Sequence, residues 1–65
     1  MIYELVEKEN GSSDLSRYAY VIQYFDDSCE VIYYDRNKVA RTYKNMEELY
    51  IGELINPKRF IDRIS

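Results

Sequence analysis

The centre of the chain is rich in aromatic and β-branched residues, a composition typical of β-strands, and strand alternation divides them between two faces that are both largely apolar. In residues 17–25 one face of the predicted strand carries Tyr18, Tyr20, Ile22 and Tyr24. The polar triplet Asp26, Asp27, Ser28 follows as a turn, and residues 29–34 return as a second strand in which Tyr33 and Tyr34 point to opposite faces. The centre of the chain therefore predicts a β-hairpin.

Further strands flank this hairpin. Residues 35–38 form a second polar turn and residues 39–43 a third strand, which gives an antiparallel meander. Residues 2–9 fit either a helical stripe or an alternating strand, and we favour the strand, which would be the fourth. Between this segment and the hairpin, residues 10–16 are polar and start with Asn-Gly-Ser-Ser, which predicts a loop.

The C-terminal third has helix signals. Asn45 can cap a helix and Glu48 completes a capping box, while Glu47 favours the positive end of the helix dipole. The expected apolar stripe consists of Met46, Leu49, Tyr50, Ile51, Leu54 and Ile55, and Gly52 marks a place where the helix loosens or ends. Asn56-Pro57 predicts a second, short helix over residues 57–64. The inward positions of that helix would be Phe60, Ile61 and Ile64.

Residues 1–65 are thus predicted to form one compact α+β domain: an antiparallel three- to four-stranded β-meander, one helix and a short C-terminal helix. A domain of this size buries only about 60% of its unfolded surface. Its single cysteine, Cys29, excludes an internal disulfide and is expected in the core rather than as a reactive thiol. Oligomerisation is the remaining aid to stability, and we expect a homodimer.

The composition excludes most catalytic chemistry. The chain has no histidine, so zinc sites of the usual kind and histidine-based acid–base catalysis are absent. Its two glycines, Gly11 and Gly52, belong to no phosphate-binding loop. The acidic turn at residues 26–30 lacks the spacing of a calcium loop. We expect no enzyme activity, no metal and no cofactor. Without a signal peptide or membrane-spanning segment, the expected location is the cytoplasm of a bacterial host.

Charge and tyrosine content point to binding. The net charge of −3 is uneven, because residues 1–35 carry −6 and residues 36–65 carry +3. Eight tyrosines exceed what one small core accommodates, so at least one tyrosine-bearing face is expected to be an interface. A protein partner with a basic groove is favoured, and contact with a membrane is not expected. Direct nucleic-acid binding, through Arg36, Lys38 and Arg41, is the less favoured alternative.

Residues 17–52 resemble the small phage-encoded inhibitors of uracil-DNA glycosylase, which are acidic dimeric DNA mimics. The likeness rests on Tyr18 and Val21 before the Asp26-Asp27 turn, the pair Tyr33-Tyr34 followed by an acid, and the segment from Met46 to Tyr50. In composition the chain also looks like other small phage anti-defence proteins, such as anti-CRISPR proteins. The resemblance implies partner contacts by Met46, Glu47 and Tyr50, with Met46 standing where that family has an aromatic residue.

These observations predict a non-enzymatic inhibitor that occludes a nucleic-acid-binding enzyme or defence complex of the host, in part by mimicking DNA. A small structural or regulatory homodimer is the alternative. The predicted partner-binding residues are Tyr18, Tyr20, Tyr24, Asp26, Asp27, Glu30, Tyr33, Asp35, Met46, Glu47, Glu48 and Tyr50.

Overall fold

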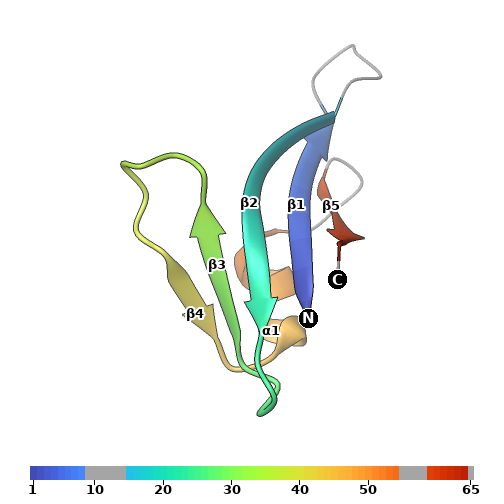
Figure 1. The fold of residues 1–65 in the computed structure, drawn as a ribbon, viewed down its shortest axis with the longest axis vertical. Coiled ribbons are helices and arrows are strands. Elements are labelled where there is room, and N and C mark those ends of the chain that lie inside the picture. Colours follow the sequence, from blue (N-terminus) through green and yellow to red (C-terminus); the bar gives the residue numbers. More distant parts are fainter. Residues whose placement is uncertain (9–14, 55–58, 65) are drawn as a thin grey trace.

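The structure, a computed structural model, describes residues 1–8, 15–54 and 59–64. They form an α+β fold in which a five-stranded antiparallel sheet packs against one helix (Figure 1). The strands lie in the order β4-β3-β2-β1-β5. In chain order the elements are β1 (Ile2–Lys8), β2 (Leu15–Gln23), β3 (Cys29–Tyr33), β4 (Arg41–Tyr43), α1 (Met46–Gly52) and β5 (Arg59–Arg63).

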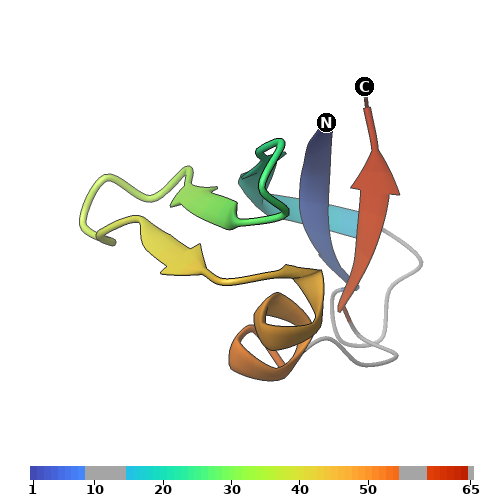
Figure 2. The same ribbon diagram turned by 90° about the horizontal axis from the view of Figure 1, so that it is seen from below.

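The helix α1 covers one face of the sheet, here called the helix face (Figure 2). The core lies between the two, because alternate residues of β1, β2 and β3 point toward α1. Tyr3 pairs with Val21 and Val21 with Val31, so these positions stack across three strands. The buried core cluster consists of Leu5, Ala19, Val21, Cys29, Val31 and Leu49.

The thiol of Cys29 belongs to this core, as predicted. Burial, with the nearby charges of Asp27 and Asp26, raises its pKa above the ordinary value. A buried thiol that stays protonated is a poor nucleophile. Cys29 therefore serves as a small apolar side chain.

The central hairpin and the helix start agree with the sequence-based predictions. Asp27 takes a left-handed conformation, with φ of 71°, at the end of the turn between β2 and β3. A left-handed residue at the end of a three-residue loop is common in hairpins, and aspartate tolerates this conformation better than most residues. The Asn45 side chain accepts a hydrogen bond from the Glu48 amide at 2.9 Å. The Glu48 carboxylate accepts from the Lys44 amide at 3.3 Å, one residue before the cap.

The predicted C-terminal helix over residues 57–64 is wrong. Arg59–Arg63 forms the edge strand β5, which pairs with β1 so that Leu5 lies opposite Ile61. Phe60 and Ile61 are residue types that strands accept readily, and β1 has a second edge whose backbone groups need partners. The N-terminal segment is a strand, as favoured, and it lies inside the sheet between β2 and β5. In the predicted loop at residues 10–16, Leu15 and Ser16 instead belong to β2, and the other residues lie outside the described part of the chain, as do Asn56 and Pro57.

A β-bulge changes the predicted face of one tyrosine. Leu5 pairs with Ala19 but Val6 pairs with Arg17, so Tyr18 is the extra residue of β2. Tyr18 packs against the core cluster on the helix face, although strict alternation placed it with Tyr20. The predicted strand at residues 39–43 is also shorter, because β4 begins at Arg41.

Candidate protein-binding surface

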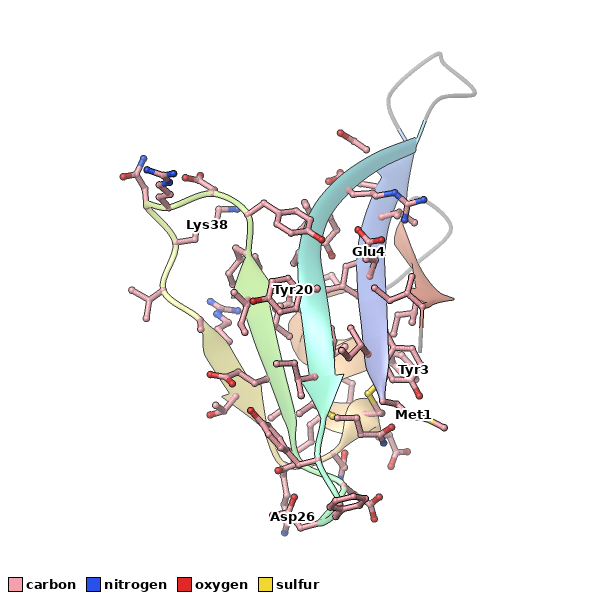
Figure 3. All side chains as sticks on the ribbon, in the orientation of Figure 1. Met1, Tyr3, Glu4, Tyr20, Asp26 and Lys38 are labelled. Carbon is pink, nitrogen blue, oxygen red and sulfur yellow. The ribbon has the colours of Figure 1, made fainter. Side chains whose placement is uncertain are left out.

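The sheet face turned away from α1 is the larger candidate surface. Within the part of the chain that the structure describes, no helix or strand packs over it (Figure 2). Figure 3 shows Glu4 and Tyr20 on its near side, with α1 behind the sheet. We call it the open face and define it by Glu4, Arg17, Tyr20, Ile22, Tyr24, Glu30, Ile32 and Tyr34.

Aromatic and aliphatic side chains form the middle of the open face. The rings of Tyr20 and Tyr34 pack with their centroids 5.8 Å apart and tilted by 39°. Ile32, which lies opposite Tyr20 in the sheet, and Ile22 are both half-buried. Rings of this kind offer large contact area with few rotatable bonds, so little entropy is lost when a partner covers them.

Carboxylates hold two of the tyrosine hydroxyl groups. The Tyr34 hydroxyl donates to Glu4 Oε2 at 2.9 Å, and Arg17 Nη1 lies 3.0 Å from Glu4 Oε1. The Tyr24 hydroxyl donates to Glu30 Oε1 at 2.9 Å. Partial burial and the bond to Glu4 raise the pKa of Tyr34, while the bond to Glu30 is the main cause of a raised pKa for Tyr24. Both phenols therefore stay protonated as donors, and the face has ordered rings with acidic groups beside them.

A second polar cluster joins the end of α1 to the sheet. The Glu53 carboxylate is buried and accepts hydrogen bonds from the Tyr33 hydroxyl at 2.8 Å and the Tyr43 hydroxyl at 2.6 Å. Arg41 Nη1 lies 3.8 Å from the same carboxylate. Burial and the bond to Glu53 raise the pKa of Tyr33 and of Tyr43, so both phenols remain donors. This cluster has a structural role, because it fixes the C-terminal end of α1 to β3 and β4.

Gly52 allows this cluster to form. A Cβ atom at position 52 would lie 2.7 Å from the Tyr43 hydroxyl oxygen and 2.8 Å from Tyr43 Cζ, well inside contact distance. We expect Gly52→Ala to lower the free energy of unfolding by about 1–3 kcal/mol, as overpacking does elsewhere. Urea denaturation followed by circular dichroism measures this change. In a Tyr43→Ala background the substitution should cost much less, and an equal cost in both backgrounds would argue against the steric explanation.

The predicted partner-binding residues do not form one surface. Tyr20, Tyr24 and Glu30 lie on the open face, whereas Tyr18 and Tyr33 lie on the helix face. Of the others, Asp26 and Asp27 occupy the turn between β2 and β3, Asp35 follows β3, and Met46 packs against the core. The exposed part of α1 carries Glu47, Glu48 and Tyr50.

Five residues of the open face were not predicted. Ile22 and Ile32 lie on the same face of the sheet as Tyr20, so strand alternation would have been enough to predict them. Tyr34 was recognised as facing away from Tyr33 but was not assigned to a site. Glu4 and Arg17 join the face only through the register between β1 and β2, which the sequence does not display.

The described residues contain no group of three or more metal-ligating side chains. Among them no helix has the length and apolar character needed to cross a membrane. Neither a family model, nor a curated protein, nor a solved structure matches the chain.

Proposed function

We propose that the chain is a small binding protein that acts by covering a surface of a partner protein with its open face. The observation that carries this proposal is the uncovered middle of the sheet, where the Tyr20 and Tyr34 rings pack together beside two half-buried isoleucines. Ordered aromatic side chains surrounded by polar groups are typical of residues that dominate binding energy. Catalysis has no part in this function.

The proposed partner is a nucleic-acid-binding enzyme or defence complex of a bacterial host, which the protein would inhibit by occlusion. Glu4 and Glu30 support an electrostatic contribution, because they place carboxylates beside the rings of the open face. Asp26 and Asp27 follow at the tip of the β2–β3 hairpin. Carboxylates spread over a contact surface compete for the basic groups that bind phosphates, and they speed association at low salt.

Matched tyrosine substitutions test the binding surface. Tyr24, Tyr34 and Tyr50 are 48%, 51% and 45% exposed, but only Tyr50 lies on α1, away from the open face. In affinity capture from bacterial lysate, measured by quantitative mass spectrometry, we expect Tyr24→Ala and Tyr34→Ala to lose the partner that the wild-type chain retains. Tyr50→Ala should keep it. Loss only with Tyr50→Ala would instead support a contact through the start of α1, as the family resemblance implies.

The DNA-mimicking part of the proposal has a separate test. Duplex DNA should displace the captured partner, and raising the NaCl concentration from about 50 mM to about 500 mM should weaken the complex at least tenfold, because exposed charges are then screened. A complex that duplex DNA does not displace, and whose affinity does not change with salt, would show that occlusion occurs without DNA mimicry.

A homodimer that uses the open face for its own assembly is the second candidate. The same uncovered rings favour it, because a twofold axis through that face would bury Tyr20 and Tyr34 of both copies. In that case Tyr34→Ala would convert a stable dimer into a monomer in sedimentation equilibrium, while Tyr50→Ala would not.

A further inference from the structure

The tip of the β2–β3 hairpin presents an apolar ring that the fold does not use. Phe25 is 111% exposed, more than in an extended reference peptide, so its side chain packs against nothing in the domain. The turn itself is well ordered. The Tyr24 amide donates to the Ser28 carbonyl at 2.9 Å, and the Asp27 amide donates to the Tyr24 carbonyl at 3.0 Å. Any residue compatible with a tight turn could occupy position 25, so the turn does not explain a phenylalanine.

Two acids stand next to this ring. Asp26 and Asp27 follow Phe25 directly, and hydrogen bonds from Ser28 to Asp26 lower the pKa of its carboxyl, which therefore stays charged. Together the three residues make a tip with an apolar centre and negative charge beside it. We call residues 25–27 the plug.

A cavity of about 500 Å³ lies on the helix face, near the end of β3 and the end of α1. Its volume falls within the range of sites that hold small molecules, so it is large enough to admit a phenylalanine ring. Six of its lining residues carry the argument: Tyr18, Tyr33, Lys38, Val39, Arg41 and Leu54. We call this cavity the socket.

The lining of the socket offers apolar surface for the Phe25 ring and positive charge for the acids of the plug. Val39 and Leu54 are 86% and 70% exposed, so they offer an apolar rim, and the half-buried Tyr18 and Tyr33 contribute aromatic surface. Lys38 and Arg41 supply positive charge, with the Lys38 ammonium 5.5 Å from the centroid of the Tyr33 ring.

Two lining carboxylates oppose this charge, Glu7 and Glu53. The hydroxyls of Tyr33 and Tyr43 donate hydrogen bonds to the Glu53 carboxylate, in the polar cluster described above. Acids of an incoming plug would remain at the rim, beside Lys38, while its ring enters.

We propose that the plug of one copy inserts into the socket of a second copy. The Phe25 ring fills apolar space between Val39 and Leu54, and Asp26 and Asp27 lie at the rim beside Lys38, since Arg41 is already paired with Glu53. The two features lie far apart: Figure 3 shows Asp26 at one end of the sheet and Lys38 near the other. In the proposed head-to-tail arrangement the contact is heterologous, and each added copy presents a new plug and a new socket.

This assembly uses Asp26 and Asp27 but leaves Glu4, Glu30 and the rings of the open face accessible, because the socket lies on the helix side of the sheet. The acids of the plug come from the acidic first half of the chain, and Lys38 and Arg41 of the socket come from the basic second half. A single ring and the acids beside it bury little area, so the association is weak and concentration-dependent. Copies joined in this way would present several open faces to one partner and gain avidity.

Sedimentation velocity over a concentration series up to the millimolar range tests the proposal on the purified chain. We expect the weight-average mass of the wild type to rise beyond that of a dimer, and less so at high salt. Phe25→Ala, which lacks the plug, and Lys38→Glu, which disables the socket, should each associate at least about 30-fold more weakly. Both side chains are exposed, so circular dichroism should show an unchanged fold.

Mixing the two variants gives the decisive result. The intact plug of Lys38→Glu can enter the intact socket of Phe25→Ala, so an equimolar mixture should form a 1:1 dimer that grows no further. The control Ile51→Ala, which removes an exposed apolar residue of α1, should associate like the wild type. A monomeric wild type throughout the series, undiminished association of Phe25→Ala, or a mixture that stays monomeric would each overturn the proposal.

Discussion

Glu53→Ala is expected to remove about 2–4 kcal/mol from the free energy of unfolding, because it leaves two part-buried tyrosine hydroxyls without their charged acceptor. Glu53 accepts hydrogen bonds from two tyrosine hydroxyls, and its side chain is 3% exposed. Water therefore cannot readily take the place of the carboxylate as the acceptor for these hydroxyls. A domain of this length has roughly 3–10 kcal/mol in total. Most molecules should therefore unfold at moderate temperature, as thermal denaturation followed by circular dichroism would show.

Glu47→Ala is the control, because Glu47 is exposed in the first turn of the same helix and should cost less than about 1 kcal/mol. The same cluster predicts a pH dependence. The pKa of Tyr33 and of Tyr43 is raised in the folded state, so their contribution is complete below the unfolded phenol pKa of about 10 and is lost at higher pH. Equal losses for Glu53→Ala and Glu47→Ala would show that the cluster does not stabilise the domain.

Leu49→Ala is expected to cost about 3–5 kcal/mol, because it leaves a cavity between α1 and the sheet. Leu49 is the fully buried residue of α1, and its neighbours in the core come from β1, β2 and β3. A helix of seven residues has little stability of its own, so its place depends on this packing. Urea denaturation measures the loss.

The control for Leu49 lies two residues away. Ile51 is 73% exposed on the same helix, and Ile51→Ala should change the free energy of unfolding by no more than about 0.5 kcal/mol. Similar effects of the two substitutions would mean that α1 is not held to the sheet by Leu49.

Local signals explain why much of the fold could be predicted from the sequence. The turn at Asp26-Asp27-Ser28 and the cap at Asn45 depend on residues within a few positions of each other, and both are found where expected. The edge strand β5 depends instead on a partner more than fifty residues away in the chain. Its residues suit a helix or a strand about equally, and pairing with β1 decides between them.

The candidate surface was predicted only in part for a similar reason. Alternation correctly separates Tyr33 from Tyr34, but the bulge at Tyr18 breaks the parity of β2 and turns that residue toward the core. The sequence does not predict the role of Glu53, because a glutamate after a helix is ordinarily solvated. Its burial follows from the close approach of Tyr43 to Gly52, which only the assembled fold displays.

Isoleucine methyl NMR tests the open face as the binding surface most directly. Ile22 and Ile32 lie on that face, whereas Ile51 is exposed on α1, so one labelled sample reports on both surfaces. On titration with the captured partner, the methyl signals of Ile22 and Ile32 should shift or broaden while that of Ile51 stays unchanged. Perturbation of Ile51 with unchanged signals from Ile22 and Ile32 would contradict the proposed function.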